Sequence, residues 1–205
     1  MVRIFVATFS EDGKLRVANI VARSKIYGPG WRTVIWFQGC TLACKGCWNK
    51  DLWPKAGGES WEVDQLLNHL LEIDTEGVTF LGGEPLEQAE PLATLMSGLK
   101  KQGRSIFLYS GFNVNELNEA MLRCYNLSDI AVMGRYVESL RNTNLRWRGS
   151  SNQIIEFNSE TYTENDLDGE ASEYEIHIDE NGHYSIVGYP PEEVLKEIEK
   201  LRSKT

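Results

Sequence analysis

The sequence predicts an α/β fold built around a parallel sheet. Continuous apolar runs alternate along the chain with segments whose apolar residues recur at helical spacing. Four of these runs end in a turn that contains glycine, and parallel strands in such folds carry their chemistry at their carboxyl ends. Strands that alternate with helices need right-handed crossovers and lie parallel. We therefore expect the unusual residues, which follow these strands, to meet at one edge of the sheet.

The first two strands and the helix between them follow from local pattern. The run RTVIWFQG (32–39) is apolar throughout and ends in glycine, which predicts a strand buried on both faces. Ser60 can cap the next helix. The apolar stripe of that helix comprises Val63, Leu66, Leu67, Leu70 and Leu71. The run GVTFLGG (77–83) predicts the second buried strand, which ends in two glycines.

The remaining elements continue the alternation. A helix through 92–99 carries leucines and a methionine on one face, and SIFLYSG (105–111) predicts a third strand. A helix through 117–124 follows. The runs DIAVMG (129–134) and NQIIEF (152–157) predict the last two strands of the core.

The composition changes after residue 157, which divides the chain into a core (1–157) and an extension. Residues 158–175 carry seven acidic side chains and no Lys or Arg, which predicts a solvated acidic linker. The segment 176–205 predicts a hairpin that turns at the Asn-Gly pair 181–182. A helix is expected after the Pro-Pro pair 190–191.

The bulk composition excludes several functional classes. The chain has 205 residues and a net charge of −9, so we expect neither a nucleic-acid partner nor docking to an anionic membrane. No apolar run approaches the length of a membrane span, and the amino-terminal residues do not resemble a secretory signal. These features predict a cytoplasmic protein, in which clustered cysteines indicate metal or redox chemistry.

Three of the four cysteines lie within eight positions, as Cys40, Cys44 and Cys47. A structural zinc site and a ferredoxin-like cluster would each need a fourth ligand, and three incidental thiols would be an unusual coincidence. The remaining interpretation is a [4Fe–4S] cluster with one open iron that binds a substrate. Cys124 fits an apolar helix face and is expected to be a core thiol.

The spacing C-x3-C-x2-C at the end of a buried strand resembles the loop of radical S-adenosylmethionine (SAM) enzymes. LGGEP (81–85), one strand later, resembles the stretch that holds the methionyl amino group. This resemblance implies that Cys40, Cys44 and Cys47 bind a [4Fe–4S] cluster whose open iron binds SAM. It also implies reductive cleavage of SAM to a 5′-deoxyadenosyl radical that abstracts hydrogen from a substrate.

The resemblance also assigns SAM contacts. Gly46 and Trp48 lie where the cysteine loop would meet SAM, and Trp48 is suited to packing on the adenine. Gly82 and Gly83 allow close backbone approach, and Glu84 supplies negative charge near the methionyl ammonium. No catalytic residue is assigned beyond the cluster ligands.

The glycine before the third cysteine narrows the resemblance, because CKGCWN is similar to the loop of the activating proteins of anaerobic ribonucleotide reductase. That family implies a shortened, open (β/α) barrel that abstracts hydrogen from a glycine of a large glycyl radical enzyme subunit. It implies a flavodoxin or ferredoxin as electron donor and anaerobic function. The further matching stretches are YGPGWR (27–32), YSGF (109–112), GRYVESLRN (134–142) and LRWRGSSNQ (145–153).

Some interpretations stay open. Met133 stands where the family usually has an acidic residue, so the target could be another protein, a peptide or a small molecule. A metal-binding module without turnover is a further alternative. The stretch around Arg146 and Arg148 is either a polar loop or a partner for a carboxylate or for the protein substrate.

Overall fold

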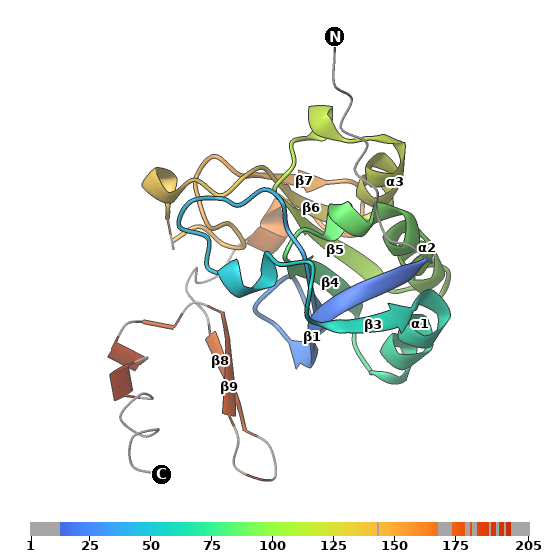
Figure 1. The fold of residues 1–205 in the computed structure, drawn as a ribbon, viewed down its shortest axis with the longest axis horizontal. Helices are drawn as coiled ribbons and strands as arrows, with labels where there is room; N and C mark the ends of the chain where they lie inside the picture. The colour runs from blue at the N-terminus through green and yellow to red at the C-terminus, as the bar shows by residue number, and fades with distance from the viewer. Residues whose placement is uncertain are drawn as a thin grey trace.

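The computed structural model of the chain describes residues 13–142, 144–167, 174–178, 181, 184–188, 190–191, 193–194 and 196–197. Within these residues, a seven-stranded sheet has the strand order β3-β1-β2-β4-β5-β6-β7, and a separate two-stranded sheet pairs β8 with β9 (Figure 1). None of the helices in these ranges is long and apolar enough to cross a membrane.

Four parallel strands form the centre of the large sheet. They are β2 (Arg32–Phe37), β4 (Gly77–Gly82), β5 (Ser105–Ser110) and β6 (Ile130–Met133). Each runs parallel to the next, from β2 to β6. All four were predicted from their apolar runs, and the parallel α/β core is confirmed.

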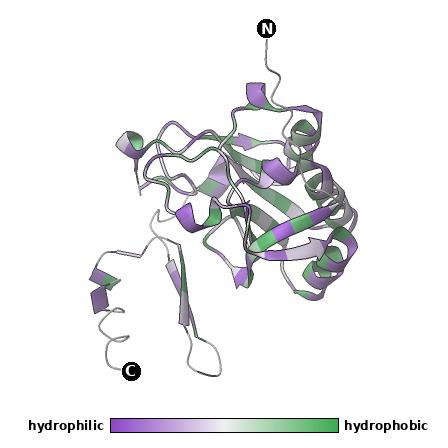
Figure 2. Cartoon of the chain, in the orientation of Figure 1, coloured by the Kyte–Doolittle hydropathy of each residue, from purple (hydrophilic) through white to green (hydrophobic). Residues whose placement is uncertain are grey.

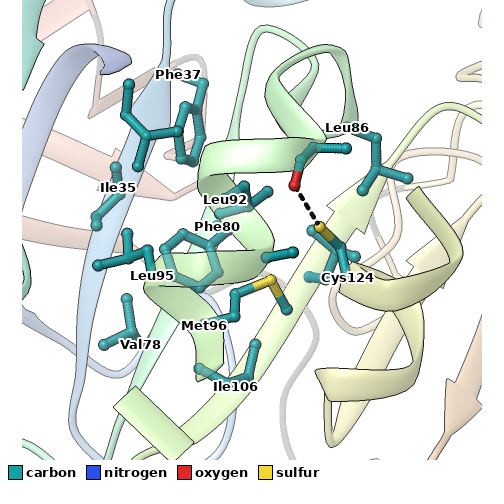
Figure 3. Packing of buried hydrophobic residues seen from close by; sticks show 14 of the residues in the cluster. Ile35, Phe37, Val78, Phe80, Leu86, Leu92, Leu95, Met96, Ile106 and Cys124 are labelled. Carbon is teal, nitrogen blue, oxygen red and sulfur yellow. Dashed lines mark hydrogen bonds between the residues drawn. The ribbon is translucent and has the colours of Figure 1, made fainter. Parts of the chain in front are cut away.

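Three helices connect these strands and bury one face of the sheet: α1 (Val63–Glu72), α2 (Ala89–Lys101) and α3 (Glu119–Leu127). Figure 2 shows both hydrophobic and hydrophilic residues on each helix, as expected for helices with one buried face. Figure 3 shows the core between helices and sheet. Cys124 is fully buried there and donates from Sγ to the carbonyl oxygen of Ala89 at 3.3 Å, which confirms it as a core thiol.

The strands at both ends of the sheet, β3 and β1 at one end and β7 at the other, pair antiparallel with their neighbours. The prediction of a parallel sheet therefore holds only for its centre. Strand β1 (Lys14–Ser24) was not predicted, and it pairs with β2 and with β3 (Glu59–Glu62). Ser60 does not cap α1, because it lies in β3 opposite Arg16. Strand β7 (Ile154–Phe157) pairs antiparallel with β6, since the connection between them contains no α-helix to carry the chain back.

The strands predicted around Asn181 form as β8 (Tyr174–Ile178) and β9 (Tyr184–Gly188), paired antiparallel. This hairpin contacts the core where the backbone N–H of Gly188 donates to the hydroxyl of Tyr27 at 3.0 Å. Most of the helix expected after residues 190–191 lies outside the described residues.

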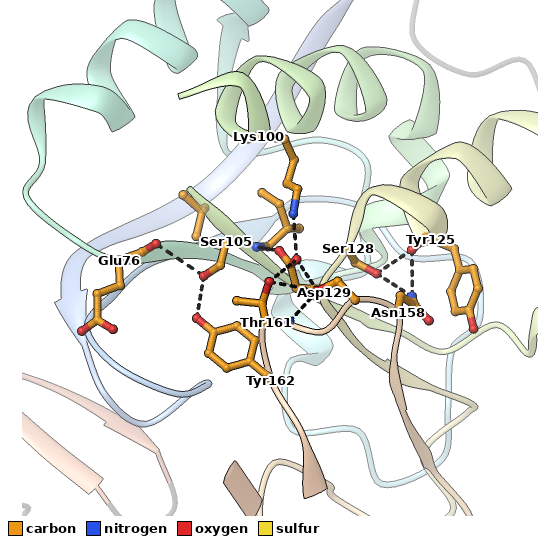
Figure 4. Close-up of polar contacts among 12 residues, drawn as sticks. Glu76, Lys100, Ser105, Tyr125, Ser128, Asp129, Asn158, Thr161 and Tyr162 are labelled. Carbon is orange, nitrogen blue, oxygen red and sulfur yellow. Dashed lines mark hydrogen bonds and ion pairs between the residues drawn. The ribbon is translucent and has the colours of Figure 1, made fainter. Parts of the chain in front are cut away.

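The first part of the predicted acidic linker packs against the sheet instead of lying free in solvent. Asp129 is buried, pairs with Lys100 Nζ at 2.7 Å, and accepts hydrogen bonds from Ser159 and Thr161 (Figure 4). The hydroxyl groups of Tyr162 and Ser105 lie 2.8 Å apart. Hydroxyl-bearing residues of this segment therefore attach it to Asp129 and Ser105 of the core.

Arg32, the last residue of YGPGWR, is completely buried at the amino end of β2. Its guanidinium donates to Thr79 Oγ1 at 2.7 Å, to Val78 O at 2.9 Å and to Ser105 Oγ at 2.9 Å. Burial lowers the pKa of Arg32 from its usual value. A Cβ on Gly28 would lie 2.6 Å from the Cδ of Arg32, so glycine there leaves room for this side chain. The motif thus joins the amino ends of three strands.

Candidate functional site

A pocket lies where the carboxyl ends of the parallel strands meet. Residues that follow β2, β4, β5 and β6 all contribute to its lining. Eight residues were predicted from the sequence to bind the cluster or SAM. Seven of them lie in that lining: Cys40, Cys44, Cys47, Trp48, Gly82, Gly83 and Glu84. The eighth, Gly46, is not among the lining residues.

The cysteine loop is shaped by tight local turns. Gly39 has φ +100° and Ala43 has φ +46°, so the backbone takes left-handed conformations at two positions of the loop. The N–H of Cys47 donates to the carbonyl oxygen of Cys44 at 3.1 Å. All three loop cysteines are partly buried free thiols. Desolvation raises the pKa of Cys40 to about 11 and also raises the pKa of Cys44.

The donor set fits an iron–sulfur cluster with one open position. Among the described residues that line the pocket, three are cysteines and none is a histidine. The described part of the chain has no group of three or more His, Cys, Asp or Glu side chains gathered to hold a single metal ion. In a [4Fe–4S] cluster each thiolate binds a different iron, so the three sulfurs need not surround one point. Thiolates are the usual protein ligands of such clusters.

The turn after β4 packs backbone to backbone against the start of the cysteine loop. Gly83 N donates to Phe37 O, and Glu84 N donates to Gly39 O, both at 2.8 Å. A Cβ on Gly83 would lie 2.2 Å from Gly39 O, and one on Gly82 would lie 2.4 Å from Phe37 N. Gly82 also has φ +115°. Only glycine at both positions permits this approach.

Glu84 links the ends of two strands. Its carboxylate accepts hydrogen bonds from Leu86 N at 2.9 Å, from Ser110 Oγ at 2.9 Å and from Gly111 N at 2.8 Å. It is 1% exposed, and burial raises its pKa to about 7 against the effect of these three donors. The side chain therefore joins the LGGEP turn to the YSGF stretch while it lines the pocket.

We expect the stability of the cluster-free protein to fall as the pH rises from about 5 to 8. The pKa of Glu84 is about 7 in the folded chain against an ordinary value of 4.5, so ionisation in this range disfavours folding. The shift corresponds to a cost on the order of 3 kcal/mol once Glu84 is ionised. Neighbouring Glu87 contributes to the rise in pKa. Urea unfolding at several pH values should show a flatter profile for Glu84→Gln; an identical profile would contradict the assignment.

A segment between β6 and β7 contacts the cysteine loop. Glu138 pairs with Lys45 at 3.2 Å, and its Oε1 would lie 2.7 Å from a Cβ on Gly46. The guanidinium of Arg141 lies over the ring of Trp48, 4.6 Å from its centroid. Gly46 has φ +74°, a backbone conformation that favours glycine, and a side chain there would displace the carboxylate end of Glu138.

The two arginines of LRWRGSSNQ take different places. Trp147 has φ +57° and packs edge to face on Phe107, with 5.3 Å between ring centroids. Arg146 lies over the Trp147 ring and donates to Asp166 O at 3.2 Å. Arg148 lines the pocket. Trp147, whose backbone is in the left-handed region, therefore separates the positions of the two arginines. Their closeness in the sequence could not reveal this difference.

Other lining residues were not singled out beforehand: Asn49, Tyr109, Tyr136, Arg141 and Gln153. All five lie in stretches that resembled the family, so position in a matching stretch was the available signal. The N–H of Asn49 also donates to Cys47 Sγ at 3.4 Å, which places a backbone donor beside one cysteine sulfur.

Comparison with known proteins agrees with this geometry. The family model described as a 4Fe-4S single cluster domain matches residues 26–156. The anaerobic ribonucleoside-triphosphate reductase-activating protein of Escherichia coli K12 is 32% identical over 139 residues, which cover 63% of this chain and 90% of that protein. The protein of that name from Enterobacteria phage T4 is 30% identical over 142 residues, covering 66% of this chain and 89% of the phage protein.

Two further likenesses are more limited. The pyruvate formate-lyase-activating enzyme of Clostridium pasteurianum is 42% identical over 94 residues, covering 43% of this chain and 40% of that enzyme. The crystal structure of QueE from Escherichia coli aligns with a TM-score of 0.43 at 17% identity, over 50% of this chain and 57% of that one.

Two of these findings establish the family of the chain. The family model matches residues 26–156, and the activating protein of Escherichia coli K12 is matched over 90% of its own length. The chain belongs to the radical SAM family of anaerobic ribonucleoside-triphosphate reductase-activating proteins, whose members are iron–sulfur enzymes.

Proposed function

We propose that this chain is an activase that cleaves SAM and abstracts hydrogen from a glycine of a partner enzyme. The observation that carries the proposal is that the three-cysteine loop and the glycine-rich turn after β4 face one pocket. The identity to activating proteins over most of their length supports the same function. The partner would be the large subunit of an anaerobic ribonucleotide reductase.

In this proposal, Cys40, Cys44 and Cys47 hold a [4Fe–4S] cluster by three thiolates. An iron without a protein ligand would remain available to the amino and carboxylate groups of SAM, as an open position does in catalytic metal sites. The chemistry supplied by the reduced cluster is one-electron cleavage of SAM to methionine and a 5′-deoxyadenosyl radical. A flavodoxin or ferredoxin would provide the electron.

The chain's own residues would bind and orient SAM. Gly82 and Gly83 let the turn after β4 pack closely against the start of the cysteine loop, so the backbone of this turn would lie in the pocket beside the cluster and near the methionyl end. Glu84 places a carboxylate in the lining beside them. Trp48 is 50% exposed and lines the pocket, where its ring could pack on the adenine.

The open sheet suits a macromolecular substrate. Strands β3 and β7 stand at the two ends of the strand order and do not pair with each other among the described residues. We propose that this is the shortened, open (β/α) barrel expected for the family, with room for a loop of the partner.

The proposed division of the chain is a core (1–157), a linker (158–175) and an extension (176–205). The proposed location of the protein is the cytoplasm.

A second target deserves a test because Met133 occupies the end of β6 where the family usually has an acid. The alternative is a radical SAM enzyme that modifies another protein, a peptide or a small molecule. The anaerobic protein should be mixed with dithionite, SAM and the large subunit of an anaerobic ribonucleotide reductase. The expected result is a glycyl radical in the electron paramagnetic resonance (EPR) spectrum. SAM cleavage without this radical would favour another target.

Arg148→Gln should raise the KM for SAM or for the partner enzyme, whereas Arg146→Gln should change neither. Of these two arginines, only Arg148 lines the pocket. Loss of a guanidinium that binds a carboxylate costs about 1.5–3 kcal/mol, which weakens binding roughly 10- to 100-fold. SAM cleavage without partner and radical transfer with partner separate the two possible ligands. Equal effects of the two variants would refute a pocket role for Arg148.

A further inference from the structure

The turn η2 (Pro85–Gln88) and the residue before it carry three buried polar side chains that reach different parts of the site: Glu84, Glu87 and Gln88. Gln88 donates to Gln38 O at 3.1 Å and accepts from Arg16 N at 2.7 Å, so it fastens the turn to β1 and to the end of β2. Glu84 reaches the end of β5, as described above. Each side chain therefore has a separate task.

Glu87 reaches the cysteine loop itself. Its Oε1 accepts from the backbone N–H of Thr41 at 2.6 Å and from the hydroxyl of the same residue. Thr41 directly follows Cys40, so this carboxylate holds the end of the loop at which the first cysteine lies. Two short hydrogen bonds from one residue are a specific anchor.

Glu87 is 5% exposed, and within the described ranges no Lys, Arg or His lies within ion-pair distance of it. A carboxylate of this kind is an electrostatic source as well as an anchor, since charge is poorly screened in a buried site. The carboxylate of Glu87 is held against Thr41, the residue that directly follows Cys40, so its charge lies beside a proposed ligand of the cluster. The N–H of Asn49 near Cys47 Sγ acts in the opposite sense.

We propose that Glu87 is a positioning residue that also lowers the reduction potential of the cluster. This inference rests on the proposed function, because it assumes a cluster at Cys40, Cys44 and Cys47. Reduction adds one negative charge to a cluster, and a buried carboxylate nearby opposes that addition. The electron comes from the external donor and is accepted by the sulfonium of SAM. The charge of Glu87 changes the driving force for that transfer, while its hydrogen bonds to Thr41 hold the loop.

The test compares Glu87→Gln with the unaltered protein after reconstitution without oxygen. The amide oxygen of glutamine can still accept from Thr41, so the loop anchor remains while the charge is removed. We expect unchanged iron and sulfide content and a shift of the midpoint potential to more positive values in an EPR-monitored titration. Glu87→Asp keeps the charge, so it should keep a potential closer to the original value while losing iron faster to a chelator.

Glu72→Gln is the matched control, because it removes the same charge from an exposed position on α1 and should leave the potential unchanged. A Glu87→Gln potential equal to that of the control would overturn the proposal. Equal shifts in Glu87→Gln and Glu87→Asp would also overturn it, since geometry and not charge would then set the value. An unaltered protein that binds no iron or sulfide would instead contradict the proposed function.

Discussion

Replacement of Cys44 with alanine is expected to leave a folded protein that holds no intact [4Fe–4S] cluster and forms no 5′-deoxyadenosine. Cys44 lies in a loop and is only partly buried, so its loss removes a ligand without opening the core. Two remaining thiolates cannot hold a cluster that already has one open iron. Iron and sulfide should fall from about four of each per chain to well below that ratio. Product analysis by chromatography measures the loss of activity.

Cys124→Ala provides the control for this experiment. Its thiol is buried in the core and donates a hydrogen bond to Ala89 O, and Cys124 is not among the residues that line the pocket. The variant should lose about 1 kcal/mol of stability and keep its cluster. Full cluster content in Cys44→Ala, or loss of the cluster in Cys124→Ala, would contradict the assignment of the ligands.

Arg32→Met should cost about 3–5 kcal/mol of unfolding free energy. The substitution removes the buried donors that satisfy Thr79 Oγ1, Val78 O and Ser105 O, and the carbonyl oxygens would lose these partners in the interior. Urea unfolding of the cluster-free protein measures the effect. Arg23→Met, at an exposed position, should change stability by less than about 1 kcal/mol. Equal effects of the two variants would show that the Arg32 contacts contribute little.

The centre of the fold could be predicted because β2, β4, β5 and β6 are buried on both faces and read as continuous apolar runs. Strand β1 alternates buried and exposed positions over part of its length, and β3 is almost entirely exposed. Their strand structure depends on pairing, of β1 with β2 and β3 and of β3 with β1, which local sequence does not specify. The cap assigned to Ser60 was wrong for the same reason.

The candidate site was predictable where chemistry depends on residue type and spacing, as in the cysteine loop and the two glycines after β4. It was not predictable where tertiary contacts decide. Gly46 adjoins Glu138, 92 residues later in the chain, and the separation of Arg146 from Arg148 depends on the backbone of Trp147. Glu87 is a further example, because only the folded chain places it against Thr41.

The central claim is that the pocket at the carboxyl ends of the strands supports radical cleavage of SAM. The most direct test uses protein purified and reconstituted without oxygen, reduced with dithionite and supplied with SAM. The account predicts about four iron and four sulfide ions per chain and formation of 5′-deoxyadenosine that depends on all three loop cysteines. One zinc ion per chain, no sulfide and no 5′-deoxyadenosine would contradict it.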